Sequence, residues 1–302
     1  MAALAIPLTL IIMAGNGWLR GIQNTKLPFY LTLCGLIPGA AALPFLVARF
    51  GLVGSAVANV IGMGLTAAGF LGALIHVHKG SWKPDGKVIA RQLVLGRDLI
   101  LRSLSFQVAF VSAAAVAGRV SVAALAAHQV MLQLWNFLTL VLDSLAIAAQ
   151  TLTGSALGTG RIDDARAVGE KATRLSLWFA LTLAGVFAIG GPFIRRLFTT
   201  DEAVLEAMAV PWWLLIAMIA AGGVLFALDG VLLGAGDAAF LRTLTLGSVL
   251  LGFLPGIAIA YWAETGLAGI WCGLTAMVVL RLVGDVWRFY SMRWAKIDTP
   301  ED

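Results

Sequence analysis

The chain has 302 residues, of which 60% are hydrophobic and only 12% are charged. A soluble domain carries about 25% charged residues, and a mean hydropathy of +0.92 is too apolar for a core covered by a polar surface. This composition excludes a disordered chain, a disulfide scaffold and a nucleic-acid-binding domain. The net charge of +5 does not indicate a nucleic-acid partner, because the basic residues lie in short loops beside apolar runs. The sequence predicts an all-α, polytopic protein whose partner is the lipid bilayer.

Nine apolar runs follow one another along the chain. A run of about 20 apolar residues is long enough to cross a bilayer as a helix, and segments this long, without alternation, do not suit the strands of a membrane barrel. The sequence therefore predicts a membrane helix bundle. The expected spans are 2–22, 29–48, 52–77, 97–118, 122–152, 166–191, 206–234, 238–262 and 266–290.

Lysine and arginine are distributed unevenly over the loops between these spans. Fifteen of the 21 basic residues lie on one side and only four on the other, while Arg102 and Arg281 fall inside spans. Basic loops remain in the cytoplasm during membrane insertion. The sequence therefore predicts a protein integral to the cell membrane (the cytoplasmic or inner membrane), with a cytoplasmic C-terminus.

Two blocks of sequence resemble each other at nearly the same offset. Residues 16–24 share their glycines and polar ends with 229–237, and the pattern at 51–54 recurs at 266–269. Both copies face the same way, as in the parallel repeats that relate the halves of some secondary transporters. Three further spans precede the second copy and none precedes the first, which predicts an incomplete first half of three helices and a complete second half of six. The expected domains are a first lobe at 1–78, a cytoplasmic linker at 79–96, a second lobe at 97–291 and a cytoplasmic tail at 292–302.

Specific motifs carry a resemblance to a known family. They are Gly15-Asn16-Gly17-Trp18-Leu19-Arg20-Gly21, His128-Gln129-Val130, the segment 142–150, and Asp229-Gly230 with Gly234-Ala235-Gly236-Asp237. In combination they resemble the multidrug and toxic compound extrusion (MATE) transporters, most closely the DinF-like branch. The resemblance covers nearly the whole chain and implies the fourth to twelfth helices of that family, without the first three.

The resemblance implies export of cationic or amphipathic small molecules by alternating access, coupled to inward flow of H⁺ or Na⁺. Some members couple through a carboxylate on the first helix and some through an acidic residue on the fifth. The span that would be the fifth helix, 29–48, contains no Asp or Glu. The coupling residues are therefore expected in the second half.

A polar stripe runs along the span 122–152. Four of its polar residues are spaced by seven, and a seven-residue step drifts by only about 20° around a helix. The stripe avoids lipid either by hydrogen bonding to neighbouring helices or by lining a substrate and cation pathway, with Asp143 as the exchangeable carboxylate. The substrate-pathway candidates, with one from the preceding span, are Gln107, Gln129, Gln133, Asn136 and Gln150.

The other membrane charges also allow two interpretations. Asp229 is either a structural partner for a basic residue or a cation-coupling site, as Asp143 is in the pathway interpretation. Arg281 and Asp285 are four residues apart, which favours an ion pair along one helix face, and Arg102 is long enough to reach the interface. Alternatively, Arg102 or Arg281 meets Asp143 or Asp229 across the bundle, in an ion pair that protonation of the carboxylate would break.

Several classes of function receive no support. The sequence contains no phosphate-binding loop, no metal-ligand cluster and no nucleophile–base pair, so we expect neither ATP-driven transport, nor an enzyme, nor a cofactor. The leading interpretation is a cation-coupled exporter, and whether this shortened chain is active or inactive stays open. One alternative is a non-transporting remnant or partner subunit. Another is a flippase for lipid-linked or polysaccharide precursors, which would need a strongly basic cavity, whereas Arg102 and Arg281 are the only basic residues inside the spans.

Overall fold

The structure is a computed structural model that describes residues 2–22, 24, 26–78 and 85–295. Helices, turns and short connections make up this described part, without any strand, as the all-α prediction requires. The chain divides into two compact units, Met1–Pro84 (unit 1) and Asp85–Asp302 (unit 2).

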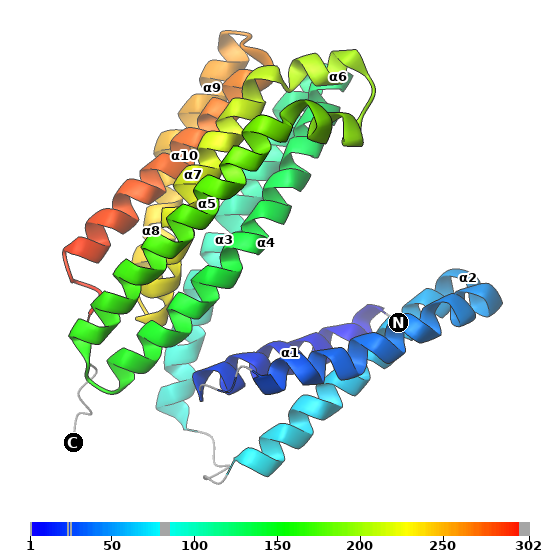
Figure 1. The fold of residues 1–302 in the computed structure, drawn as a ribbon, viewed down its shortest axis with the longest axis vertical. Coiled ribbons are helices and arrows are strands. Elements are labelled where there is room, and N and C mark those ends of the chain that lie inside the picture. The colour runs from blue at the N-terminus through cyan, green and yellow to red at the C-terminus, as the bar shows by residue number, and fades with distance from the viewer. Residues whose placement is uncertain (1, 23, 25, 79–84, 296–302) are drawn as a thin grey trace. The chain divides into compact units, whose positions relative to one another are not determined.

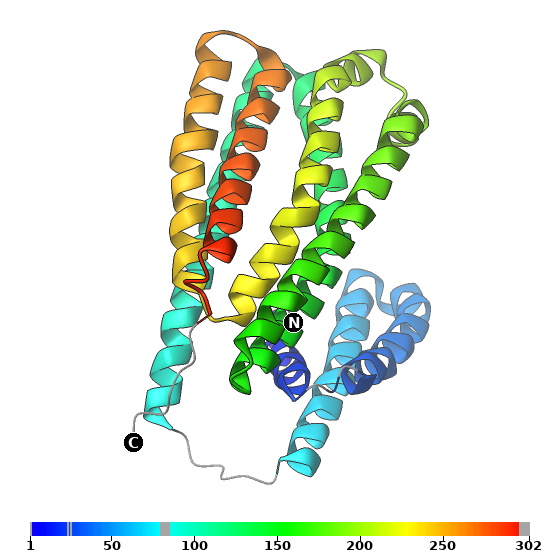
Figure 2. The same cartoon turned by 60° about the vertical axis from the view of Figure 1, so that its left-hand side comes forward.

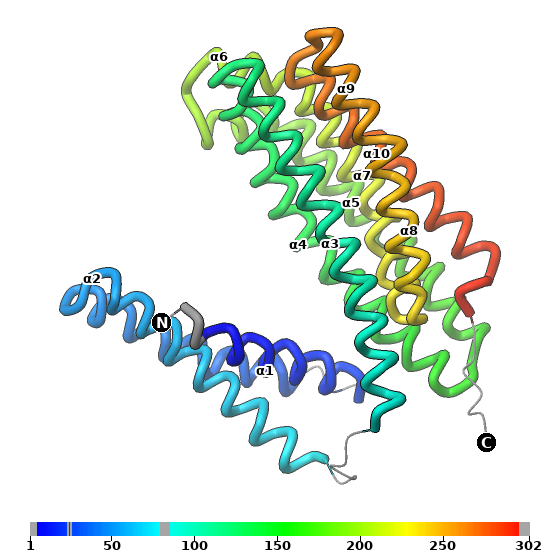
Figure 3. Tube along the Cα trace, turned by 180° about the vertical axis from the view of Figure 1, so that it is seen from behind, coloured from blue at the N-terminus to red at the C-terminus, as the bar shows by residue number. Residues whose placement is uncertain are grey.

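Unit 1 contains two long helices, α1 (Ala2–Gly21) and α2 (Lys26–Val77). Helix α2 is broken at Gly51, whose φ of 55° and ψ of −133° suit a residue without a β-carbon. Beyond Gly51 the chain turns back, so that the two limbs of α2 lie against each other (Figure 3). A β-carbon at Gly39 on the first limb would lie only 3.1 Å from Cα of Gly62 on the second. Small residues of this kind allow membrane helices to approach closely.

Unit 2 is a bundle built around one central helix. Helix α7 packs against α4, α5 and α10, and 61% of its most apolar stretch is buried, against 17% to 44% for the other long helices of the unit. Figures 1 and 2 show this arrangement from two sides. In chain order the elements are α3 (Gly86–Val120), α4 (Val122–Gly158), α5 (Ile162–Phe198), α6 (Glu202–Ala207), α7 (Ala209–Gly234), α8 (Ala238–Ser248), the π-helical turn η1 (Val249–Phe253), α9 (Leu254–Trp262) and α10 (Gly266–Tyr290).

A π-helical turn interrupts the expected span 238–262. The N–H of Leu254 donates to the carbonyl of Val249, five residues earlier. Pro255 follows directly and has no N–H to continue the ladder of hydrogen bonds. The proline therefore coincides with a local widening of the helix, a common position for a bend.

The number of membrane spans is not confirmed as nine. Seven helices of the described residues are long and apolar enough to cross a membrane. The expected spans 29–48 and 52–77 both lie in α2, which counts as one helix, and 2–22 forms α1, which is not among the seven.

The segment expected as a linker, 79–96, is helical from Gly86 onward, where α3 begins. Asp85 caps this helix, because its carboxylate accepts a hydrogen bond from the N–H of Lys87 at 2.8 Å. The start of that segment, 79–84, and most of the expected tail, 296–302, lie outside the described residues.

Candidate functional site

The candidate site is a cluster of charges centred on Asp229, inside unit 2. Asp229 lies on the central helix α7 and is only 4% exposed. Its Oδ2 accepts a hydrogen bond at 2.6 Å from Nη2 of Arg281 on α10 and another from Nη2 of Arg102 on α3. Arg281 is also 4% exposed. The cluster therefore joins three helices through one buried carboxylate.

An aromatic ring supports both guanidinium groups. The guanidinium carbon of Arg281 lies 4.8 Å from the centre of the Phe106 ring, and that of Arg102 lies 5.8 Å from it. At these distances a cation is attracted to the face of an aromatic ring. Sequence analysis did not select Phe106, although its position four residues after Arg102 on a helix was the signal that could have found it.

Asp285 does not form the ion pair that sequence spacing favours. Arg281, four residues earlier on α10, reaches across to Asp229 instead. Asp285 is completely buried, and neither of its carboxyl oxygens receives a hydrogen bond from the described residues. A cross-helix pair therefore replaces the expected pair along α10, and a second buried carboxyl lies beside the first.

Asp143 lies on α4 at the edge of the same cluster. It is half-buried and close enough for the charges of Asp229, Arg102 and Arg281 to act on it. No hydrogen bond or ion pair ties it to them among the described residues. Of the sequence-selected charges, Arg102, Arg281 and Asp229 thus meet directly, while Asp143 and Asp285 lie next to them.

The polar stripe of α4 is on the surface of unit 2. Its amide side chains are exposed and make no hydrogen bond to other side chains in the described part of the unit, which gives no support to hydrogen bonding between the helices of unit 2. Gln107 on α3 is exposed as well. The exposed residues of the stripe are Gln129, Gln133, Asn136 and Gln150.

A second set of ion pairs lies at the end of unit 2 where α3 begins and α10 ends. Asp98 on α3, 2% exposed, accepts a hydrogen bond at 2.6 Å from Arg242 on α8. Arg288 on α10 donates at 2.6 Å to Asp237, which precedes α8. Sequence analysis did not single out Asp98. These pairs join helix ends and are separate from the Asp229 cluster.

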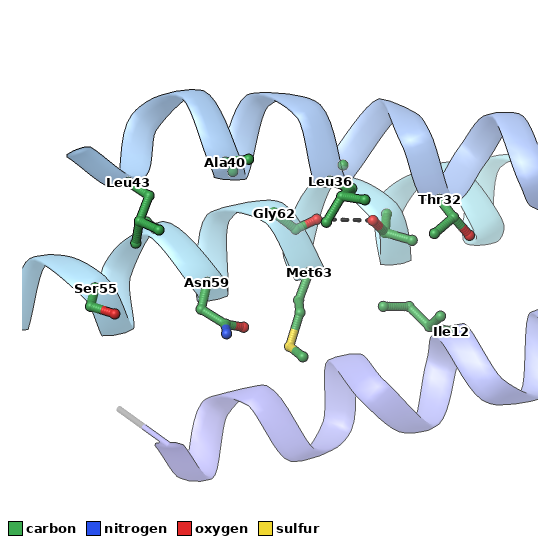
Figure 4. A pocket seen from close by; sticks show the side chains of 13 residues that line it. Ile12, Thr32, Leu36, Ala40, Leu43, Ser55, Asn59, Gly62 and Met63 are labelled. Carbon is green, nitrogen blue, oxygen red and sulfur yellow. Dashed lines mark hydrogen bonds between the residues drawn. The ribbon is translucent and has the colours of Figure 1, made fainter. Parts of the chain in front are cut away.

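Unit 1 contains a cavity of about 490 Å³ between α1 and the two limbs of α2 (Figure 4). Its walls are mainly apolar, with Asn59, Ser55 and Thr32 as polar members; Thr66 Oγ1 donates within its own helix to the carbonyl of Gly62 at 3.0 Å. Binding sites for small organic molecules are typically apolar cavities with few polar groups, and their volume is usually about 300–1,000 Å³. None of these residues was selected as a site residue from sequence, because no charge marks them.

The bundle, its apolar exterior and its buried ion cluster define a polytopic helical membrane protein. The MatE family model matches residues 99–258, more than half of the chain. The chain belongs to the MatE family, as the resemblance in its motifs predicted.

Individual relatives are longer than this chain. Protein DETOXIFICATION 44, chloroplastic, of Arabidopsis thaliana is 30% identical over 321 residues, which cover 100% of this chain and 59% of that protein. DNA damage-inducible protein F of Escherichia coli is 27% identical over 303 residues, covering 94% of this chain and 64% of that protein, in agreement with the DinF-like resemblance. The chain spans between 56% and 59% of the length of three DETOXIFICATION proteins.

Solved structures agree on the fold. A crystal structure of a MATE protein in a bent conformation superposes on this chain with a TM-score of 0.84 at 18% identity. The superposition covers 95% of this chain and 66% of the MATE chain. A Vibrio cholerae MATE transporter variant gives a TM-score of 0.83 at 18% identity, covering 93% of this chain and 66% of its own.

Proposed function

We propose that this chain forms much of a secondary active exporter of amphipathic or cationic small molecules, driven by inward flow of H⁺ or Na⁺. The observation that carries the proposal is the Asp229 cluster: a buried carboxylate, shared by arginines from two other helices, in a member of the MatE family. Buried ionisable groups in membrane proteins are costly, and they mark ion pathways more often than they serve packing alone.

The coupling mechanism follows from the partners of Asp229. Arg102 on α3 and Arg281 on α10 hold these helices to α7 only while the carboxylate is charged. A proton or cation that binds to the carboxylates of the cluster changes which of these pairs form, so that α3 and α10 rearrange relative to α7. Ion binding thereby biases a two-state rearrangement, as alternating access requires. Asp143, half-buried beside the cluster, is the entry point for the ion.

The substrate class follows from two surfaces. The exposed amides of the α4 stripe offer hydrogen bonds without charge, and the unit 1 cavity offers an open apolar hollow large enough for a drug-sized molecule. Both suit an amphipathic compound. The transported species is therefore a small organic molecule and not an inorganic ion alone.

The cluster argues against a flippase for lipid-linked or polysaccharide precursors. Such a protein needs free cations to hold phosphate or carboxylate groups. Arg102 and Arg281 are both paired with Asp229, so neither is free for an anionic headgroup. The other alternative, a non-transporting remnant or partner subunit, predicts a folded chain without export in the assay described below.

The expected orientation places the C-terminus in the cytoplasm of a cell-membrane protein. One end of unit 2 carries Arg97 and Arg242, and α10 ends there with Arg288. The start of α5 lies at the same end and adds Arg161, Arg166, Lys171 and Arg174. The opposite end carries Arg119, Arg195 and Arg196. The excess of basic residues at the first end supports its cytoplasmic position.

The test is the substitution Asp143→Asn, which keeps the shape of the side chain and removes its charge. In proteoliposomes loaded with a cationic dye, we expect the wild-type chain to export dye when a pH or Na⁺ gradient is imposed. The variant should lose gradient-driven export while eluting as the same monodisperse species. Asn cannot exchange a proton, so the loss would follow from chemistry and not from size.

The matched control is Asp163→Asn, the same change at an exposed position in the first turn of α5. It should export dye at the wild-type rate. Unchanged export in Asp143→Asn would remove Asp143 from the coupling site. No export by the folded wild-type chain would favour the remnant or partner-subunit interpretation.

A further inference from the structure

Three buried oxygen atoms in the Asp229 cluster receive no hydrogen bond from the residues that the structure describes. They are Oδ1 of Asp229 and both carboxyl oxygens of Asp285. Buried polar atoms in proteins almost always have a partner, and a buried carboxylate without a donor is among the most costly groups to desolvate. The two carboxyl groups lie within hydrogen-bonding reach of each other.

The arginines around Asp285 are bound to other carboxylates. On its own helix, Arg281 donates to Asp229 and Arg288 donates to Asp237. From α3, Arg102 donates to Asp229. Other charged or titratable residues on neighbouring elements are Arg242 of α8, paired with Asp98, Asp143 and His128 of α4, and Lys87, Arg91, Arg97 and Arg119 of α3. The turn η1 and helix α9 carry no Asp, Glu, Lys, Arg or His.

A single proton satisfies two of these three oxygens. Two carboxylates can only accept hydrogen bonds, so a bond between Asp285 and Asp229 needs a proton on one of them. Asp229 already receives two charge-assisted hydrogen bonds that favour its ionised form. The proton therefore belongs on Asp285, from which it is donated to Asp229.

We propose that Asp285 is the proton-binding residue of this chain and that Arg281 is its switch; this inference rests on the proposed function. With the proton in place, Arg281 pairs with Asp229 across the α7–α10 interface. When the proton leaves, Arg281 moves to Asp285, four residues along its own helix, where the spacing allows an ion pair. Asp229 then keeps Arg102 alone, whose buried Nε has no acceptor within the described part of the chain. The coupled ion is H⁺.

The charge balance supports a proton and not Na⁺. Arg102 and Arg281 together carry two positive charges, which balance Asp229 and Asp143 when Asp285 is neutral. A Na⁺ ion bound at Asp285 would lie beside two guanidinium groups, and like charges at such distances repel strongly in a low-dielectric interior. A proton adds no volume and needs no oxygen cage.

The consequence for the fold is a proton-dependent contact between two helices. Arg281 links α10 to the central helix α7 only in the protonated state. Loss of the proton replaces an interhelical pair with one inside α10. The proton thus changes which helices are held together. A local change of charge of this kind shifts an element between two conformations.

Infrared spectroscopy of the purified 302-residue chain in detergent tests the assignment directly. A protonated carboxylic acid has a carbonyl-stretch band that a carboxylate lacks and that shifts in heavy water. At neutral pH exposed Asp and Glu are ionised, so we expect the band in wild type to come from the buried cluster. It should be lost in Asp285→Asn and retained in Asp98→Asn, which alters another buried carboxyl that is paired with arginines.

Absence of the band in wild type, or its survival in Asp285→Asn, would overturn the assignment. Asp285→Glu provides a second variant, in which the band should reappear at a shifted position. Because the measurement detects the proton itself, it does not depend on transport. A chain with the band but without dye export would count against the proposed function, whereas export without the band would count against Asp285 alone.

Discussion

The substitution Asp229→Ala is expected to destabilise unit 2 by about 3–5 kcal/mol, the usual effect of removing one partner from a buried ion pair. The alanine leaves the guanidinium of Arg281, 4% exposed, and that of Arg102 without their shared carboxylate. In a domain of this size a loss of that magnitude lowers the melting temperature by on the order of 10 °C. Scanning fluorimetry of the purified protein in detergent measures the change.

The internal repeat provides the matched control for this prediction. Asn16 occupies the position in α1 that Asp229 occupies in α7, and its side-chain amide donates to the carbonyl of Ile12 in its own helix at 3.1 Å. Asn16→Ala therefore removes one local hydrogen bond, worth about 1 kcal/mol. Equal melting temperatures for Asp229→Ala and wild type would show that the cluster does not stabilise unit 2.

A triple variant separates loss of charge from loss of packing. Replacing Asp229 with Leu and both Arg102 and Arg281 with Met turns the ion cluster into an apolar contact of similar volume. Such replacements are often neutral or stabilising. We expect the triple variant to melt close to wild type while lacking gradient-driven export, which would assign the charges to function and not to folding.

Apolar runs predicted the helices well because burial in hydrocarbon and helix formation require the same side chains. They did not predict where the helices end. Helix α5 spans Ile162–Phe198, whereas the expected span was 166–191, since backbone hydrogen bonds continue beyond the apolar stretch. Likewise α3 begins at Gly86, within a polar segment that hydropathy assigns to a linker. The short helix α6 has too few residues to give a periodic signal.

The sequence predicted which charged residues belong to the candidate site better than it predicted their ion-pair partners. The positions of Arg102, Asp229 and Arg281 inside spans marked them as special, because charges in lipid are costly. The spacing of Arg281 and Asp285 indicated a pair on one helix, yet Arg281 binds Asp229. That preference depends on the packing of α7 against α10, a tertiary contact that no local spacing encodes.

The second large effect is expected from Gly230→Ala in α7. A β-carbon at Gly230 would overlap the backbone of α4 at Ala146, 2.9 Å from its Cα, and Gly234 one turn later meets Gln150 in the same way. Backbone cannot move aside as a flexible side chain can. Overpacking of this kind costs about 1–3 kcal/mol, and here it also displaces Asp229, the next residue. We expect a melting temperature lower by several degrees and weaker export.

The repeat again gives the control, because Gly17 in α1 corresponds to Gly230. Among the described residues, a β-carbon at Gly17 would meet no atom within 4 Å beyond its chain neighbours and its own helix backbone, and the same holds for Gly21, the counterpart of Gly234. Gly17→Ala should therefore leave the melting temperature unchanged or raise it slightly, since alanine favours a helix over glycine by about 1 kcal/mol. If both alanine variants behave alike, the close approach of α7 to α4 is not what requires glycine at position 230. A lower melting temperature in Gly230→Ala alone would show that the repeated glycine motif forms a close contact between helices in unit 2 and forms no such contact within unit 1.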